Sequence, residues 1–479
     1  MGAGRLSHPG RAVSLALVLL AASAASARPA EAGPGGAAAG AFVLRTPAVA
    51  SDGGDGSTFD PGVAPSGVRY CRFLPGASRP AQLAPAPPQF APPPSPEPPN
   101  TPVPAETTAA QMAIFNDLWA TVDELYVDPA FNGVDWDGVY DRYAAKVAAG
   151  LTEENFAALM KRMIQELHDE HSSYQTAAEV QEEERRVAEG LNFVGIGASF
   201  LPVGDAGSVL YVLPGSPAAL AGILPHDLLV SVDGGPLRDA AGRARTLGEA
   251  GTPVTVQVRR GGALITFNLV RAAVSAPVPV DSCLVAGTRI GYIFLPTFFD
   301  ASITEQVRSA LQKLMAGGPL DGLIIDNRVN GGGLESQAKG VLSFFTSGNH
   351  GAYVSRTGST PFSVTAQEVG NSQTVPLVVL IGQGTASYGE IFSGVLRASG
   401  EAKTVGLTTK GNVELLNSTS FSDGSRVWLA RQTFQPVGLP AGAWEDSGIA
   451  ADFVVHGQWH EFTEVDDPAF ARAIAILSE

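Results

Sequence analysis

Cysteine is scarce in this chain of 479 residues, which contains only Cys71 and Cys283. Two cysteines exclude a cysteine-ligated zinc cluster and a multi-disulfide scaffold, and they allow at most one bridge. Basic residues are also in short supply, with 31 lysines and arginines against 47 acidic residues and a formal charge of −16. A surface of that sign repels phosphate backbones, so we expect no nucleic acid partner.

Long apolar runs are absent apart from one near the N-terminus. Arginines precede the run Ala12–Ala25, which is too short to span a bilayer and ends in Ala25-Ser26-Ala27. Small residues there are typical of a signal peptidase site, so we interpret 1–27 as a secretory signal, with an uncleaved anchor as the alternative. The mature chain is then exported, periplasmic or extracellular, and has no transmembrane segment. In that oxidising setting Cys71 and Cys283 can pair, and two buried free thiols are an equal alternative.

The length is about three times that of a typical domain, so two or three folded units with linkers are expected. Thirteen of the 35 prolines lie between Pro75 and Pro104, within a stretch that has no sustained periodicity. We interpret residues 28–106 as a Pro/Gly-rich linker whose last part is extended polyproline II and whose role is open. Two apolar stretches inside it, 42–44 and 68–74, are candidate short strands.

Helical periodicity dominates residues 107–189, which we interpret as an N-terminal helical segment. Apolar residues recur every three or four positions from Ile114 to Tyr126 and again from Phe156 to Leu167. Thr152 is expected to cap the second helix, which has two glutamates in its first turn. The segment Glu179–Glu189 is charged on nearly every face and predicts an exposed connecting helix.

Residues 190–274 change to short strands joined by glycine and proline turns. The expected strands are 194–200, 209–212, 228–232 and 254–259. Between them Ser216 is expected to cap one short helix that has Pro217 in its first turn and stops at Gly222.

This order of elements, continuing through Pro225–Gly234, resembles a PDZ domain, and His226 stands where that family usually has glycine. The resemblance implies a groove that takes an extended peptide as an added strand. It also implies that the terminal carboxylate of the peptide is held on backbone N–H groups of Val194, Gly195, Ile196 and Gly197. A small β-domain that serves as a spacer is the alternative.

Residues 275–479 alternate between strands and helices, which predicts an α/β unit with ligands at the carboxyl ends of its strands. The expected strands are 290–295, 322–327 and 375–381, and the expected helices are 303–315, 333–345 and 387–398. Two of these strand ends are followed by residues suited to catalysis. Ser387 lies on a tight turn at a helix start, where free N–H groups stabilise an oxyanion, although an ordinary N-cap is the alternative. Gly331, Gly332 and Gly333 allow close backbone approach to a ligand, although they also suit a simple turn.

Four motifs, in order, resemble those of the C-terminal processing (tail-specific) serine protease family. They are Ile290–Ile293 with Phe298, Leu323–Gly333, Thr385–Ile391 and Gly448–Asp452. The resemblance spans about 107–455 and implies a mixed α and β chain with a helical lead-in, a PDZ β-domain and a crotonase/ClpP-like α/β protease core.

The family resemblance also implies site roles. Ser387 is the expected nucleophile, and the oxyanion hole is expected to use its own or a neighbouring N–H and one of Gly331 to Gly333. Arg328 and Asn330 are expected to shape the glycine loop.

The general base departs from the bacterial pattern of the family, which pairs the serine with a lysine. A gapless overlay puts Asn412 at the lysine position, and an asparagine cannot take a proton from serine. A two-residue deletion would put Lys410 there, with Glu414 replacing the glutamine of the family.

A histidine is the other candidate base, because imidazole titrates near neutral pH. His171 and Glu445 lie in motifs that resemble the tricorn-like branch of the family, in which a histidine base is supported by a glutamate. A Ser387, His171 and Glu445 arrangement obeys the logic of a catalytic triad. Lys410 and the absence of any competent base stay open as alternatives.

The sequence thus predicts an exported serine endopeptidase that captures a polypeptide, by its C-terminus, on the PDZ domain and cleaves it through an acyl-enzyme. The first alternative is a catalytically impaired peptide-binding protein on a protease scaffold. The second is an ester hydrolase that uses Ser387, Asp452 and His456, against which Thr385 breaks the required motif. No histidine pair has metal-ligand spacing with a carboxylate, so we expect no metal and no cofactor. The oligomeric state is not predicted.

Overall fold

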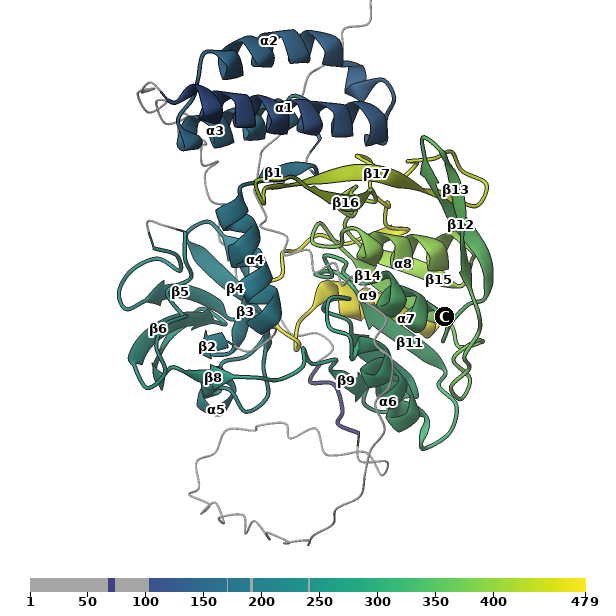
Figure 1. Ribbon diagram of the computed structural model, residues 1–479. Helices are drawn as coiled ribbons and strands as arrows, with labels where there is room; N and C mark the ends of the chain where they lie inside the picture. The colour runs from purple at the N-terminus through teal and green to yellow at the C-terminus, as the bar shows by residue number, and fades with distance from the viewer. Residues whose placement is uncertain (1–67, 74–102, 170, 190–192, 240–241) are drawn as a thin grey trace, which may run out of the picture.

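The computed structural model describes residues 68–73, 103–169, 171–189, 193–239 and 242–479. The expected signal sequence and nearly all of the expected linker lie outside these residues. Three units of the fold are visible in Figure 1: a helical unit, a small β-unit and a larger core. No helix in the described part of the chain is long and apolar enough to cross a membrane.

The helical unit packs three helices on one apolar cluster. They are α1 (Ala105–Leu125), α2 (Trp136–Ala148) and α3 (Glu153–Gln165). Thr152 caps α3 as expected, because its hydroxyl accepts a hydrogen bond from the Asn155 N–H. Helix α2 was not predicted, and its N-terminus is capped by the side chain of Asp135.

The core is built on a six-stranded sheet that is buried on both faces. In spatial order its strands are β18 (Phe453–Val454), β15 (Ala402–Gly406), β14 (Leu377–Ile381), β11 (Gly322–Asp326), β10 (Ile290–Phe294) and β9 (Ser282–Leu284). All neighbours are parallel except β9 and β10. This parallel arrangement agrees with the expected α/β alternation and confirms the mixed α and β fold class.

Alternation along the central strands explains why helices cover both faces of this sheet. On β14, Val379 and Ile381 belong to a cluster with α6 (Ile303–Met315), α7 (Glu335–Leu342) and α8 (Tyr388–Ala398). Val378 and Leu380 belong to the opposite cluster, which contains α9 (Pro468–Leu477). Because β11 and β14 are parallel, their carboxyl ends, which lead to the candidate residues, lie at the same edge of the sheet.

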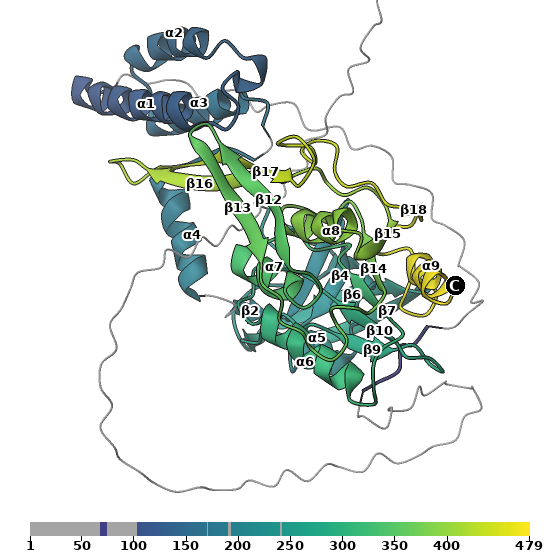
Figure 2. The same cartoon turned by 90° about the vertical axis from the view of Figure 1, so that its right-hand side faces the viewer.

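A second sheet joins the core to the helical unit. Its strands are β1 (Ser173–Gln175), β17 (Arg426–Pro436), β12 (Gly348–Ser355) and β13 (Gly358–Val364), with β16 (Leu415–Ser420) on β17. Figure 2 shows this sheet between the helices α1 to α3 and helix α8. Val427, Leu429 and Ala430 of β17 are buried against the helical unit. The pairing of β1, which begins two residues after His171, with β17 was not predicted from the sequence.

The small β-unit follows α4 (Ala177–Glu189), the connecting helix. It contains a five-stranded antiparallel sheet, β3 (Ala198–Val203), β4 (Ala206–Val212), β5 (Leu228–Val232), β6 (Pro253–Arg260) and β7 (Ala263–Val270), and the pair β2 (Phe193–Gly195) and β8 (Ala272–Val274). The short helix α5 (Pro217–Ala221) has the expected cap at Ser216 and ends at left-handed Gly222.

The expected continuous strand 194–200 is wrong, because the chain breaks into β2 and β3 around Ile196 and Gly197. The Gly197 φ is +78°, a left-handed conformation that glycine adopts without strain. The carbonyls of Ile196 and Gly197 accept hydrogen bonds from Ala218 and Leu213 at 2.8 Å each. This loop therefore turns its carbonyls toward α5.

Cys71 and Cys283 form a disulfide, so the paired alternative holds and the free-thiol alternative is wrong. The bridge fastens residues 68–73 to the edge of the core sheet, where Tyr70 pairs in parallel with Leu284. The Cys71 N–H also donates to the Leu284 carbonyl at 2.8 Å.

Replacing both cysteines by serine should destabilise the core, since the bridge closes a loop with a sequence separation of 212 residues. We expect the free energy of unfolding in urea to fall by about 2–5 kcal/mol. Reduced wild-type protein is the control and should unfold like the double variant. A double variant as stable as the oxidised wild type would contradict this prediction.

Candidate active site

Ser387 stands at the turn between β14 and α8, at the carboxyl edge of the core sheet. Its backbone has φ +53° and ψ −127°, a conformation that a residue with a side chain seldom adopts. Strain of this kind persists only where surrounding contacts impose it, and it is concentrated at functional sites. The Ser387 N–H donates to the Asn412 carbonyl at 2.7 Å and to the Glu390 carboxylate at 3.1 Å.

Glu390 is the group that imposes this turn. Its side chain is fully buried on the first turn of α8. Besides the Ser387 N–H, its carboxylate accepts hydrogen bonds from the Thr409 hydroxyl at 2.5 Å and from the Gly411 and Asn412 N–H groups at 2.7 Å each. Burial raises the pKa of Glu390, and these four hydrogen bonds act in the opposite direction. The carboxylate thus ties the serine turn to residues 409–412.

The glycine loop lies against Ser387. A Cβ atom added at Gly332 would lie 2.7 Å from the Ser387 Cβ and 3.1 Å from its hydroxyl oxygen. A Cβ atom at Gly333 would overlap the Phe298 backbone, because the Phe298 N–H donates to the Gly332 carbonyl and the Leu334 N–H donates to the Phe298 carbonyl. Only glycines allow this approach. The same contacts delay α7 to Glu335, so the expected helix 333–345 is too long at both ends.

Of the two expected oxyanion donors, the Ser387 N–H and a neighbouring N–H, the geometry favours the neighbouring one, because the Ser387 N–H is donated to Asn412 and Glu390. The Gly332 N–H is likewise donated to the Asn330 side chain, at 2.9 Å. The neighbouring Tyr388 N–H faces Gly332, where an added Cβ would lie 3.0 Å from its nitrogen. This leaves Tyr388, with Gly331 or Gly333, as the candidate donors.

Asn330 and Arg328 hold the glycine loop in different ways. Asn330 is fully buried, and its carbonyl accepts from the Ala386 N–H at 3.0 Å, next to the serine. The Arg328 guanidinium turns away from the serine and lies between Asp326 and Asp467, with contacts of 2.5 Å to each carboxylate. Asn330 therefore shapes the loop directly, whereas Arg328 fixes the chain just before it.

His171 and Glu445 are brought together from opposite ends of the folded chain. The His171 Nε2 and the Glu445 Oε1 lie 2.8 Å apart, and the two side chains are 9% and 16% exposed. The other carboxylate oxygen of Glu445 accepts from the Val413 N–H at 2.8 Å. Since the preceding residue, Asn412, holds the Ser387 N–H, this pair is attached to the nucleophile turn.

Three carboxyl groups surround the imidazole. The Asp169 carboxylate accepts from the backbone N–H of His171 at 2.6 Å. A ring nitrogen of His171 and one carboxylate oxygen each from Asp169 and Glu414 all lie within 4.8 Å of one another. Burial lowers the pKa of His171, but the Glu445 hydrogen bond and the charges of Asp169, Glu445 and Glu414 outweigh it and raise the pKa to about 9. Burial, with the charges of Asp169 and Glu445, raises the pKa of Glu414 to about 8.

Lys410 is exposed, unlike His171, although its N–H donates to the Thr385 carbonyl near the serine. A lysine that acts as a base usually sits in a desolvated pocket, which lowers its affinity for a proton. Asn412 occupies the position beneath the serine, as the gapless overlay predicts, and contributes backbone groups. The geometry favours the histidine over the lysine as the candidate base.

The residues of the ester hydrolase alternative do not form a triad with Ser387. The Asp452 carboxylate pairs with Arg397 at 2.8 Å and accepts from the Thr404 N–H at 2.9 Å, so it fastens β15 and α8. Thr385 donates its hydroxyl to the Asn327 carbonyl at 2.8 Å. That alternative therefore has no geometric support.

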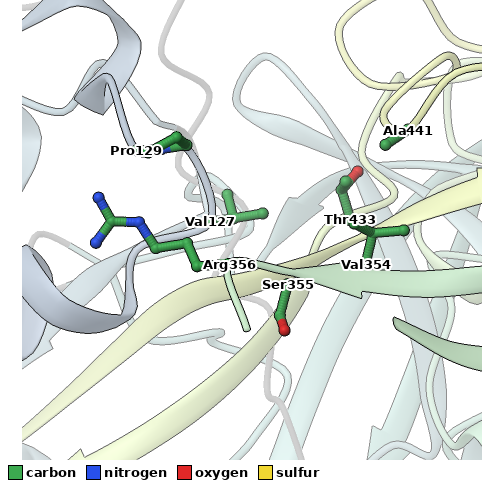
Figure 3. Close-up of a pocket in the computed structure, with 7 residues that line it drawn as sticks. All are labelled: Val127, Pro129, Val354, Ser355, Arg356, Thr433 and Ala441. Carbon is green, nitrogen blue, oxygen red and sulfur yellow. The ribbon is translucent and has the colours of Figure 1, made fainter. Parts of the chain in front are cut away.

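A pocket of about 560 Å³ opens at the seam between the helical unit and the second sheet (Figure 3). Its lining is mostly apolar and consists of Val127, Pro129, Val354, Ser355, Arg356, Thr433 and Ala441. The Thr433 hydroxyl is buried and has no hydrogen-bond partner among the described residues. A Cβ atom added at Gly442 would lie 3.5 Å from that hydroxyl and 3.9 Å from the Glu445 Cβ. Ala441 of the pocket wall thus stands four residues before Glu445, the partner of His171.

Sequence reasoning missed two carboxyl groups of the site. Glu390 stands three residues after Ser387, which is the spacing of a capping box, so this signal was available. Asp169 stands two residues before His171, and its carboxylate accepts a hydrogen bond from the backbone N–H of His171, a local contact that an aspartate at this spacing often makes.

Comparisons with known proteins cover all three units. Residues 289–455 match the peptidase family S41, residues 108–165 match the tricorn protease C1 domain, and residues 208–260 match the PDZ domain. The carboxyl-terminal-processing protease of Synechocystis sp. is 30% identical over 374 residues, which are 75% of this chain and 84% of that protein. The chloroplastic C-terminal processing peptidase of Tetradesmus obliquus is 29% identical over 366 residues, which are 71% of this chain and 76% of that protein.

A solved structure agrees with these sequence matches. The photosystem II D1 C-terminal processing protease superposes with a TM-score of 0.53 at 26% identity. The superposition covers 72% of this chain and 93% of that chain.

Replacing Glu414 by glutamine should lower the pKa of His171, because the neutral amide removes one of the negative charges that favour the imidazolium. In wild-type protein we expect the rate of fluorophosphonate labelling of Ser387 to rise with pH up to about 9, as His171 loses its proton. In the Glu414→Gln variant this rise should move to lower pH, by on the order of one unit. Lys410→Gln is the matched control and should leave the profile in place, whereas an unshifted E414Q profile would contradict the prediction.

Proposed function

The chain belongs to the peptidase S41 family of carboxyl-terminal processing proteases and is a serine-type peptidase, and we propose that it is an exported endopeptidase that cleaves polypeptides through an acyl-enzyme on Ser387. The observation that carries the proposal is the attachment of the His171–Glu445 pair to the strained serine turn through residues 412 and 413. The PDZ resemblance read from the sequence is confirmed by the matched segment 208–260.

In the proposed reaction, Ser387 Oγ attacks the carbonyl carbon of the scissile peptide bond and gives its proton to His171. The ring nitrogen other than Nε2 is the acceptor, because Nε2 faces Glu445. The imidazolium then protonates the leaving amine, and an ester bond joins the substrate to Ser387. Water hydrolyses the ester with His171 again as the base.

Glu445 orients the imidazole and stabilises its protonated form. The negative charges of Asp169 and Glu414 favour the same form, which is why the pKa of His171 lies near 9 rather than near 6.5. A base of this strength takes the serine proton readily, but it is neutral in only a small fraction of molecules at pH 7. The activity is therefore expected to be greatest under mildly alkaline conditions.

The developing oxyanion is placed at the glycine loop. The Tyr388 N–H and an N–H of Gly331 or Gly333 are the proposed donors, because the N–H groups of Ser387 and Gly332 are used within the turn. Donors fixed in this way stabilise the negative charge without rearranging during the reaction.

The alternative, a peptide-binding protein that has lost its base, rested on Asn412 at the lysine position. The His171–Glu445 pair supplies a base from a different segment, which favours the enzyme.

Capture of a substrate C-terminus by the PDZ domain stays part of the proposal. Export is supported by the Cys71–Cys283 disulfide, since such bonds persist in oxidising compartments.

Single replacements should separate the nucleophile and the base. Ser387→Ala should abolish hydrolysis of an unstructured protein substrate, and His171→Ala should lower kcat/KM by about 10³-fold or more. Lys410→Ala should change it less than about threefold, because Lys410 is exposed. Circular dichroism of each variant controls for folding. Activity retained in S387A, or a loss in K410A as large as that in H171A, would contradict the assignment.

The seam pocket is proposed to hold an apolar side chain of the substrate. Its apolar lining suits such a side chain, and the unpartnered Thr433 hydroxyl is available to a substrate backbone group. The far wall of the pocket is formed by the loop that leads to Glu445. Val127, on the other wall, follows Tyr126, whose pKa is raised by burial and by the charges of Asp169 and Glu414. Both walls thus adjoin the groups around His171.

Filling this pocket with Ala441→Trp should reduce kcat/KM for an unstructured protein substrate by about 10-fold or more. Labelling of Ser387 by a small fluorophosphonate should stay unchanged, because the probe does not need the pocket. Leu439→Trp, an exposed position on the same loop, is the matched control. Unchanged protein cleavage by A441W would contradict the pocket assignment while leaving the catalytic assignment intact.

A further inference from the structure

His226 departs from the PDZ pattern and is used in an unexpected way. It lies in the turn before β5, and its φ of +71° places a residue with a bulky side chain in the left-handed region that favours glycine. A glycine would form the same turn without strain. Because the strain brings no benefit to the turn itself, the side chain must have a role elsewhere.

The His226 ring leaves the PDZ domain and packs on the core. It stacks on Trp459 with ring centroids 3.9 Å apart and contacts Phe462 at 5.1 Å. Its Nδ1 donates to the Trp459 carbonyl at 2.7 Å. In return, the Trp459 Nε1 donates to the carbonyl of Val209 on β4 at 2.9 Å. This exchange ties the PDZ domain to the segment that precedes α9.

Arg328 contacts the same two aromatic residues. Its guanidinium carbon is 5.2 Å from the Trp459 ring centroid and 5.0 Å from that of Phe462. The Asp326 and Asp467 carboxylates hold it in place, and Asp326 also accepts from the Tyr292 hydroxyl at 2.9 Å. The aromatic pair is therefore in contact with both His226 of the PDZ domain and Arg328 of the core.

The backbone of Arg328 contacts the serine turn. A Cβ atom added at Gly384 would lie 2.9 Å from the Arg328 carbonyl oxygen. The preceding carbonyl, that of Asn327, accepts from the Thr385 hydroxyl at 2.8 Å. Two residues after Arg328, Asn330 holds the glycine loop. A displacement of Arg328 would reach both the nucleophile turn and the proposed oxyanion donors.

We propose that His226 is a positioning residue of the peptidase: by docking the PDZ domain on Trp459, it holds Arg328 and thereby the glycine loop and the Ser387 turn in their catalytic arrangement. The inference rests on the serine peptidase activity and deepens it. The PDZ domain then contributes to the rate of the chemical step, in addition to any part it takes in binding substrate.

The docked arrangement requires a neutral imidazole. Nδ1 carries the proton that is donated to Trp459, so a second proton would place a charge on a partly buried ring that is stacked on an aromatic side chain. Burial lowers the pKa of His226 and Arg328 adds to this, whereas the Trp459 carbonyl, Asp467 and Asp326 act in the opposite direction. A lowered pKa means that docking is fully favoured above about pH 6.5 and is weakened as the pH falls below that value.

The test compares His226→Gly with His226→Asn in the full-length protein. Glycine keeps the turn and removes the ring, whereas asparagine tolerates the left-handed backbone and keeps a short donor. At pH 8 we expect H226G to lower kcat for a short peptide about 10-fold or more with little change in KM, and H226N to lose less. The same fall should occur in the rate of fluorophosphonate labelling of Ser387, which needs no PDZ contact.

A spectroscopic readout distinguishes positioning from a loss of folding. The tryptophan fluorescence of wild-type protein should change as the pH falls below about 6.5, when protonation of His226 weakens its stacking on Trp459, and this transition should be missing in H226G and in Trp459→Phe. His350→Asn is the matched control, because burial also lowers the pKa of His350 but it lies on β12. A folded H226G variant with wild-type kcat and labelling rate would overturn the proposal. Activity retained in S387A would instead overturn the assignment of Ser387 as the nucleophile.

Discussion

The buried carboxylate of Glu390 is the interaction on which the catalytic geometry depends. A carboxylate without solvent is costly unless it is fully hydrogen-bonded, and this one receives four hydrogen bonds from two separate stretches of chain, Ser387 and residues 409–412. They fix the strained backbone of Ser387 and hold residues 409–412 beneath it. The nucleophile, the segment that carries Asn412 and the attachment point of Glu445 are consequently one rigid assembly.

The base enters this assembly from outside the core. A lysine at position 412 would place nucleophile and base on neighbouring parts of one unit, whereas His171 belongs to the chain that leaves the helical unit. Its position depends on β1, which pairs with β17, and on Ser172, whose hydroxyl accepts from the Ala430 N–H at 3.0 Å. In the proposed mechanism, the packing of the helical unit on β17 therefore serves catalysis as well as stability.

The sequence was most informative where short motifs coincide with local physical rules. The helix cap at Thr152 and the turn at Ser387 follow from residue type and spacing, whereas the expectation of a His171 and Glu445 pair came from the resemblance to the tricorn-like branch. It was least informative where a long-range contact decides the outcome. The pairing of β1 with β17 and the hydrogen bond from the Ser387 N–H to the Asn412 carbonyl both join segments whose proximity exists only after folding.

The departures from the family pattern have a common physical logic. The charges of Asp169, Glu414 and Glu445 lie close together, and the raised pKa values of His171 and Glu414 keep protons on this cluster. Such a site is sensitive to the placement of every group near it, because small displacements of charged groups strongly change their interaction energies at low dielectric. Rigid docking of the neighbouring units limits those displacements. His226, strained in its own turn and stacked on Trp459, is consistent with that need, since it gives up local stability for a fixed arrangement between units.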